Sequence, residues 1–139
     1  MLFGKKPADR MVQLFTDALK KDGIKYTTHD EKPAVFIDYS GDNYNRLRFG
    51  FWFDEDGESV QLKVFSIFQF TKSQLPDAYE FCNRMNAKYR WLGFYVDSDN
   101  DFTASTDFVL SPGTIGAECL ELLRRAVNML EDVCKELNE

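Results

Sequence analysis

The densest group of potential ligands in this sequence is the acidic run Asp97-Ser98-Asp99-Asn100-Asp101. Its alternating carboxylates resemble the start of an EF-hand loop, which binds calcium through oxygen atoms. The match ends there, because Phe102 stands where that loop needs glycine and Phe108 where it needs a bidentate glutamate. Aspartate and asparagine also favour turns by bonding to their own backbone. We therefore predict a solvated hairpin turn here and no metal site.

Histidine and cysteine, the other common metal ligands and nucleophiles, are few and scattered. The one histidine, His29, lies in the polar stretch 27–31, and we expect it to be an exposed loop residue. Three cysteines, Cys82, Cys119 and Cys134, form no CxxC pair. Zinc sites need three or four such ligands at short spacing, so none is predicted. The odd number of cysteines is typical of free buried thiols in a reducing compartment.

Other catalytic patterns are weak. No glycine-rich phosphate loop of the GxGxxG or GxxxxGK type and no GxSxG nucleophile turn occurs. The remaining enzymatic interpretation is a carboxylate pair, such as Asp38 with Asp54, although carboxylates near turns are usually solvated. We therefore predict a protein that is not an enzyme and has no cofactor.

Hydrophobic periodicity predicts which elements carry these residues. Spacings of three and four predict helices over 8–22, 76–88 and 116–139, and alternation predicts strands over 34–39, 47–53, 60–70, 92–96 and 102–110. The order α-β-β-β-α-β-β-α has short hairpins and no parallel crossover. It therefore predicts an α+β fold, with a single antiparallel five-stranded sheet and helices on one face.

Composition limits the partners and the size. Seventeen Lys and Arg against 23 Asp and Glu give a net charge of −6. That charge opposes binding to nucleic acid and to anionic membranes, so neither is expected as a partner. With no spanning apolar run and no secretory signal, we expect a cytoplasmic protein. At 139 residues the chain predicts one domain over 1–139, with a flexible tail over 1–7.

Two segments carry a family resemblance: Glu80-Phe81-Cys82-Asn83-Arg84-Met85-Asn86, and Trp91-Leu92-Gly93-Phe94-Tyr95-Val96-Asp97 with its acidic turn and the apolar strand beyond. Together they resemble the YbjN family of bacterial proteins over about 34–137. The resemblance implies a regulator of sensory transduction with a fold similar to type III secretion chaperones, which are small acidic dimers that hold partner polypeptides. It carries no catalytic residue across. Asn83 and Asn86 are expected to cap helix 76–88.

Strand alternation assigns side chains to the two faces of the predicted sheet. One face is consistently apolar and should meet the helices; its residues are Phe49, Phe51, Phe53, Val60, Leu62, Val64, Leu92, Phe94, Val96, Phe102, Ala104 and Phe108. The other face carries polar residues but also collects five large apolar ones: Trp52, Phe65, Ile67, Trp91 and Tyr95. Five such side chains together would form a large exposed patch for a monomer.

Three alternatives remain open for those five residues. The N-terminal arm, the 39–45 loop or the last helix covers them, or a bulge near Phe65 turns Phe65 and Ile67 into the core. Otherwise they form a partner-binding surface. We take the last as the leading hypothesis: a non-enzymatic module that binds another polypeptide or itself, as a homodimer. The alternative function is a sensor that binds an apolar or planar small molecule on the same face.

Overall fold

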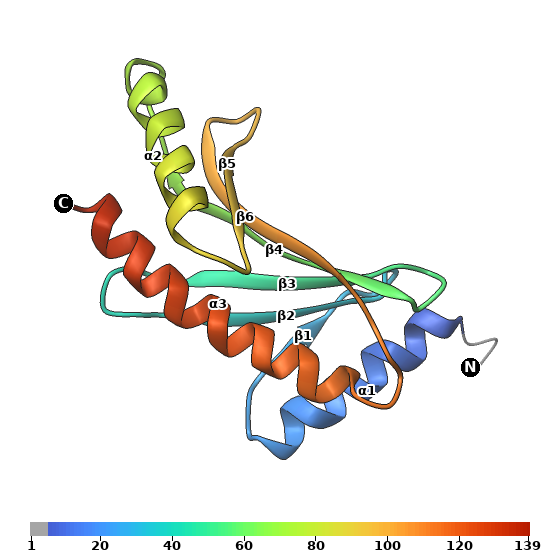
Figure 1. Ribbon diagram of the computed structural model, residues 1–139. Helices are drawn as coiled ribbons and strands as arrows, with labels where there is room; N and C mark the ends of the chain where they lie inside the picture. Colours follow the sequence, from blue (N-terminus) through green and yellow to red (C-terminus); the bar gives the residue numbers. More distant parts are fainter. Residues whose placement is uncertain (1–5) are drawn as a thin grey trace.

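The computed structural model describes residues 6–139 and confirms the predicted α+β class. Its elements, in chain order, are α1 (Pro7–Lys21), β1 (Thr27–Thr28), β2 (Ala34–Tyr39), β3 (Leu47–Phe53), β4 (Ser59–Gln69), the 3-10 turn η1 (Lys72–Gln74), α2 (Leu75–Lys88), β5 (Gly93–Val96), β6 (Asp101–Val109) and α3 (Ile115–Leu137). The strands form one antiparallel sheet in the order β1-β2-β3-β4-β6-β5 (Figure 1).

The sheet has six strands, so the prediction of five was wrong by one. The extra strand is β1, in which Thr27 pairs with Phe36 and Thr28 with Val35. Both threonines are exposed, so no alternation of apolar and polar residues marks them in the sequence. The strand exists because β2 offers a pairing edge, which is a tertiary condition.

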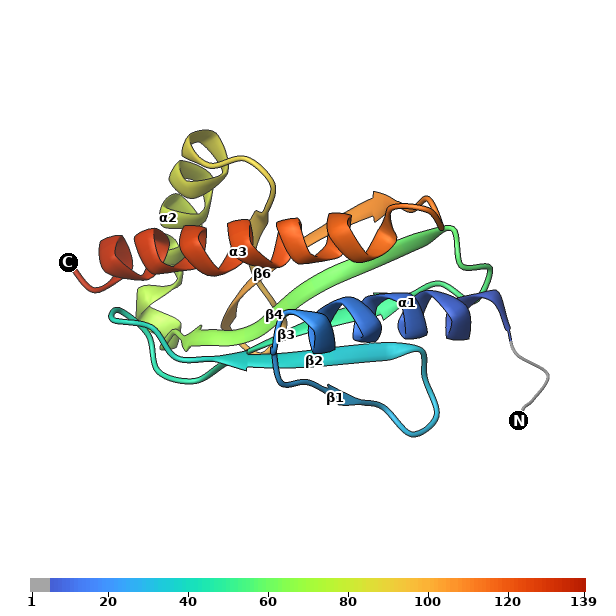
Figure 2. The same ribbon diagram turned by 90° about the horizontal axis from the view of Figure 1, so that it is seen from below.

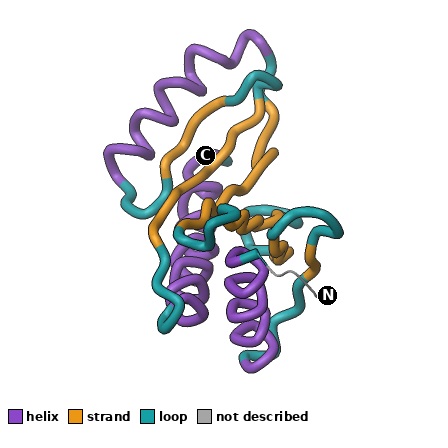
Figure 3. The backbone as a smooth tube through the Cα atoms, turned by 90° about the vertical axis from the view of Figure 1, so that its right-hand side faces the viewer, coloured by secondary structure: helices purple, strands orange, loops and turns teal. Residues whose placement is uncertain are grey.

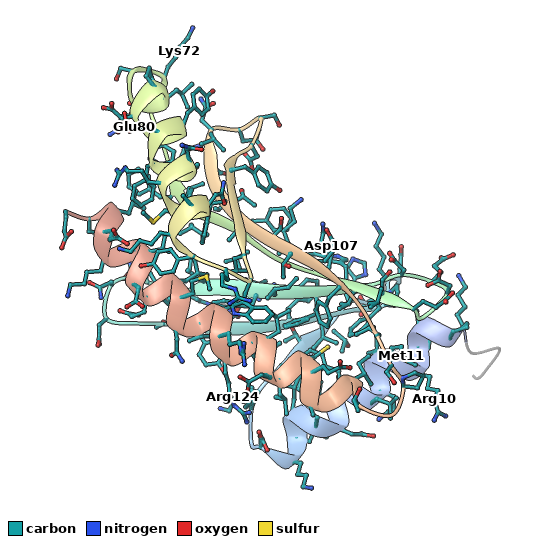
Figure 4. All side chains as sticks on the ribbon, viewed as in Figure 1. Arg10, Met11, Lys72, Glu80, Asp107 and Arg124 are labelled. Atoms are coloured by element: carbon teal, nitrogen blue, oxygen red, sulfur yellow. The ribbon has the colours of Figure 1, made fainter. Side chains whose placement is uncertain are left out.

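All three helices lie on one side of a strongly bent sheet (Figures 1 and 3). α1 and α3 run side by side on this side of the sheet (Figure 2), with α1 against β2 and β3, and α2 packs beside β5. The two long helices are joined by the ion pair between Arg124, labelled in Figure 4, and Asp22, at 2.6 Å. They also approach closely where Gly116 faces Ala18. The predicted tail over 1–7 lies mostly outside the described residues, and Pro7 already begins α1.

The core lies between this helical layer and the inner face of the sheet. The apolar face predicted from alternation is confirmed: ten of its twelve residues are at most 5% exposed, and Val96 and Phe108 pack against them half-buried. Phe15 of α1 meets Phe51 of β3 edge to face, with ring centroids 4.7 Å apart. Burial of such rings stabilises the fold through apolar area removed from water and through ring geometry.

A bulge interrupts β4 in its second half. Val64 pairs with Ala104 and Phe68 with Phe102, so three residues of β4 stand opposite Thr103 alone. Ser66, in the middle of the bulge, has a φ of 53°, in the left-handed region. Beyond this point β4 and its neighbours β6 and β5 bend away from β2 and β3 (Figure 1). A bulge increases local bend and twist in this way.

Candidate functional site

The sheet face opposite the helices carries a row of aromatic side chains, which we call the outer aromatic face: Phe36, Trp52, Phe65 and Tyr95. Phe36 and Trp52 meet edge to face at 5.3 Å, and Trp52 and Phe65 at 5.7 Å. Phe65 is 45% exposed and Tyr95 36% exposed. No helix within residues 6–139 covers this side of the sheet (Figure 3). Phe36, Trp52 and Phe65 are thus ordered by one another, and Phe65 and Tyr95 remain partly exposed within the described residues.

Two cations lie over these rings. The ammonium of Lys63 is 4.8 Å from the ring centre of Phe65 and 5.9 Å from that of Tyr95. The guanidinium of Arg48 is 5.5 Å from the ring of Phe36. Lys63 thus places a positive charge at the ring faces of Phe65 and Tyr95, whereas Arg48 also pairs with Asp38 at 2.9 Å.

Trp52 owes its place to the absence of a side chain at Gly50. The six-membered ring of Trp52 lies directly over Gly50, so a Cβ there would fall 2.5 Å from Cη2 of the indole and 3.2 Å from Phe36. Only glycine leaves room for the edge of the indole to approach the strand at that point. Phe36 was not predicted as part of the site, because 34–37 is a continuous apolar run in which alternation assigns no face.

The bulge separates Ile67 from its predicted neighbours. Ile67 is half-buried and packs against the core. Phe65 stays outside against Trp52. The bulge therefore lies where the sequence allowed one, but it returns only Ile67 to the core. The expected patch loses this member because the left-handed turn at Ser66 redirects the chain.

Trp91 is also apart from the outer aromatic face. It is half exposed and lies against α3, with the guanidinium of Arg125 4.6 Å from its ring centre. It lines a groove of about 510 Å³ between β6 and α3. Its φ of 79° is rare for so large a residue and carries the chain away from the line of β5. Alternation could not reveal this, since it assumes that the strand continues.

The 39–45 loop and α3 were two of the segments that could cover the outer aromatic face, and both lie elsewhere. The loop after β2 is held to α3: Glu131 accepts hydrogen bonds from the Asn43 backbone N–H at 2.6 Å and from its amide at 2.7 Å. α3 itself packs on the inner face (Figure 2). The N-terminal arm up to residue 5 lies outside the described residues.

The same loop borders a polar hollow of about 570 Å³, with the β4 bulge and the end of α3. Burial and the nearby Glu131 carboxylate raise the pKa of Tyr44, which lines it, to about 12. Asn138 closes one side by donating to the carbonyl of Asn43 at 3.0 Å. The polar groups here hold the loop to α3, which is a structural role.

The acidic run is a turn, as predicted. Asp97 Oδ1 accepts hydrogen bonds from the backbone N–H groups of Asp99 and Asp101, at 2.9 and 3.1 Å. Its other oxygen accepts from the hydroxyl of the buried Thr103 at 3.3 Å. The carboxylates of Asp97, Asp99 and Asp101 do lie within 4.8 Å of one another. Both carboxylate oxygens of Asp97 nevertheless accept hydrogen bonds within the turn and the strand after it. Aspartate commonly shapes turns in this way.

His29 and the three cysteines lie in different parts of the fold. His29 Nδ1 accepts hydrogen bonds from the backbone N–H groups of Glu31 and Lys32, at 3.0 and 3.1 Å, in the turn after β1. The three cysteines are free and buried, as predicted, and burial raises the pKa of each thiol. A buried thiol with a raised pKa is a poor nucleophile.

Asp38 and Asp54 do not form a carboxylate pair. Asp38 pairs with Arg48 across the β2–β3 ladder, and Asp54 follows Arg48 by six positions, roughly 20 Å along β3. Asp38 is held by Arg48 at 2.9 Å and by Arg46 at 2.5 Å. Their hydrogen bonds lower its pKa to about 2, so it is no proton acceptor near neutrality. Asp54 accepts from the hydroxyl of Ser59 within its own hairpin.

Asn86 does bond at the end of α2, as predicted. Its side-chain amide donates to the carbonyl of Phe94 at 3.0 Å and accepts from the Phe94 N–H at 2.7 Å. The asparagine therefore joins α2 to β5 as a neighbouring strand would.

The fold and the site define an α+β domain with helices on one face of an antiparallel sheet and an aromatic row on the other. The family model of YbjN, described as a putative bacterial sensory transduction regulator, matches residues 12–139. The chain belongs to the YbjN family.

A solved structure shows the same fold. The crystal structure of YbjN from E. coli, described as a putative transcription regulator, superimposes with a TM-score of 0.67. The two share 12% sequence identity over 91% of this chain and 90% of that one. None of the curated proteins searched matches the chain. Within residues 6–139, no helix combines the length and apolarity needed to cross a bilayer.

Proposed function

We propose that this chain is a non-enzymatic protein-binding module, regulatory or chaperone-like, which engages a partner polypeptide or a second copy of itself through the outer aromatic face. The observation that supports this most directly is the row of rings on a sheet face that no helix of residues 6–139 covers. Aromatic side chains with nearby charges dominate binding energy in protein interfaces, because they bury large areas at small entropic cost. The proposed setting is the cytoplasm and the proposed assembly a homodimer.

The description of the family as a regulator supports the same class of function. A likeness to type III secretion chaperones, which hold partner chains on small acidic dimers, is part of the proposal. Lys63, which forms no ion pair within residues 6–139, suits a partner surface that brings acidic groups beside apolar ones.

Replacing Phe65 by aspartate tests the proposal. Phe65 is 45% exposed, so Phe65→Asp should leave the melting temperature nearly unchanged while placing an unpaired charge in the interface. We expect self-association, or recovery of a captured partner, to fall at least tenfold. Light scattering measures the first, and quantitative mass spectrometry of proteins captured from source cells measures the second.

Tyr79→Asp is the matched control, since Tyr79 is a 58% exposed aromatic on α2, away from the outer aromatic face. It should associate like the parent chain. Two results together would contradict the proposal. The parent chain would be monomeric at high concentration, and it would capture the same proteins as Phe65→Asp does. Native mass spectrometry covers the alternative: a retained planar molecule, lost in Phe65→Asp, would favour a small-molecule sensor, for which the open ring faces of Phe65 and Tyr95 are also suited.

A further inference from the structure

The edge of the sheet at β6 is only partly covered. β5 pairs with residues 102–105 of β6 and no further. Residues 106–109 of β6 pair with β4 on one side, and no strand within residues 6–139 pairs with them on the other. An unpaired strand edge is a template for another extended chain.

The backbone groups that face this open edge can be identified. The Asp97 N–H donates to the Asp101 carbonyl, so odd-numbered residues of β6 face β5. The Leu110 N–H donates to the Glu58 carbonyl, so even-numbered residues face β4. Because the pattern alternates along an antiparallel strand, the N–H and C=O groups of Asp107 and Val109 face the open edge. Val109 is 81% exposed.

This edge is open because the backbone turns away from β6 at Trp91. Gly93 pairs with Ser105, so a regular continuation of β5 would place Trp91 opposite Asp107. The left-handed φ of Trp91 ends that continuation and moves the indole onto α3. By contrast, the outward groups of Phe94 on β5 are closed by Asn86. One edge strand is therefore protected and its neighbour is not, and left-handed conformations of large residues are concentrated at functional positions.

The groove beside the open edge shows what kind of chain would fit. Thr106, Phe108, Ala117 and Leu122 contribute to its walls, so every second residue of an added strand would meet apolar surface. Its charge is mainly negative, from Asp107, Glu118 and Glu121. Arg125 neutralises Glu121, which it contacts at 2.8 Å, and no ion pair within residues 6–139 neutralises Asp107 or Glu118. Figure 4 labels Asp107 on β6.

We propose that the β6 edge at Asp107 and Val109 binds an extended segment of a partner polypeptide by strand addition, a segment with alternating apolar residues and at least one Lys or Arg. The main-chain bonds supply affinity and the groove selects the side chains. The choice of a basic partner rests on the acidic groove. This site is separate from the outer aromatic face and does not depend on the function proposed there.

The first test uses a phage-displayed library of random nine-residue peptides panned on the full chain. We expect enrichment of peptides that alternate apolar residues with Lys or Arg. Addition of the best peptide should slow hydrogen exchange of the Asp107 and Val109 amides at least tenfold, while the amides of Thr106 and Phe108 are protected throughout. Slow exchange at Asp107 and Val109 before the peptide is added would overturn the proposal.

The second test uses Asp107→Pro, which removes an N–H that serves no bond inside the sheet. It should weaken peptide binding at least tenfold, whereas Asp107→Ala, which keeps the backbone donor, and Phe65→Asp on the other site should bind within threefold of the parent. Equal binding by Asp107→Pro rules strand addition out.

A variant that fails to fold does not decide the question, so the peptide is modified as well. Two methylated versions of the best peptide are compared, one N-methylated at its odd-numbered amides and one at its even-numbered amides. Only the version whose methyl groups lie on the amides that face β6 should lose binding to the parent chain. Equal binding by the two methylated peptides rejects the proposal. A dimer of the parent that Asp107→Pro dissociates, together with no peptide enrichment, would assign the edge to a second copy instead and also reject it.

Discussion

At the scale of single residues, Gly50 shows how a missing side chain shapes the outer aromatic face. The edge of the Trp52 indole lies over it, and the ring stands between Phe36 and Phe65. The contact is a matter of space: any Cβ at this position must move the ring or the strand. The arrangement of the rings therefore depends on a residue with no side chain of its own.

We predict that Gly50→Ala displaces the indole of Trp52 and costs about 1–3 kcal/mol of stability, as overpacking does. In a Trp91→Phe background, tryptophan emission should shift to longer wavelength as the ring becomes more solvated. Gly93→Ala is the matched control, because the nearest atom to its Cβ would be the Ser105 carbonyl oxygen at an ordinary 3.7 Å. Unchanged emission in Gly50→Ala would show that the ring does not rest on Gly50.

At the scale of elements, Asn86 makes α2 serve as a neighbour of the edge strand β5. Its amide satisfies both outward backbone groups of Phe94. The pairing closes an edge that would otherwise accept other chains. The β4 bulge is a second device of this kind, since it bends the sheet and keeps Ile67 against the core while Phe65 remains outside.

Asn86→Ala should lower the free energy of unfolding by about 1–2 kcal/mol, because the Phe94 donor and acceptor lose their partners. Asn83→Ala, on the same helix and exposed, should change it by less than about 0.5 kcal/mol. Urea unfolding measures both. Equal effects of the two substitutions would show that the link between α2 and β5 does not stabilise the fold.

At the scale of the whole molecule, the acidic chain relies on carboxylates that are paired when folded. Hydrogen bonds from Arg48 and Arg46 lower the pKa of Asp38 to about 2, and bonds from Arg125 and Lys88 lower the pKa values of Glu121 and Glu136. Groups with a lowered folded pKa stabilise the protein above their unfolded pKa. That stability disappears as the pH falls through the folded value.

We therefore predict that the free energy of unfolding falls steadily between about pH 5 and pH 2. Asp38→Asn should remove about 1 kcal/mol at pH 6, a figure reduced for solvent screening, and close to nothing at pH 2. Urea unfolding of both proteins across this range measures the difference. A gap between them that is constant with pH would mean that Asp38 acts through packing and not through its charge.

The outer aromatic face and the β6 edge occupy different parts of the molecule, one on the open side of the sheet and the other beside α3. Their charges differ, with the ammonium of Lys63 over the rings of the first and the carboxylate of Glu118 on α3 beside the second. One small domain thus presents two surfaces suited to different chemistry.

Local pattern in the sequence is enough for the helices, five of the strands, the buried face and the turn at Asp97, because periods of 3.6 and 2 assign faces without knowledge of neighbours. It also places Trp52, Phe65 and Tyr95 on one outer face. It fails for Phe36, which lies in an unbroken apolar run. A continuous run shows that residues are apolar but not which way they point.

Tertiary structure alone decided the rest. β1 forms because β2 offers it an edge, the bulge at Ser66 separates Ile67 from Phe65, and the left-handed turn at Trp91 moves its ring onto α3. Each depends on pairing between segments far apart in the chain. Strand alternation is a local property and continues only while the backbone stays regular, so residues beyond a bulge or a turn take their direction from the partners they meet.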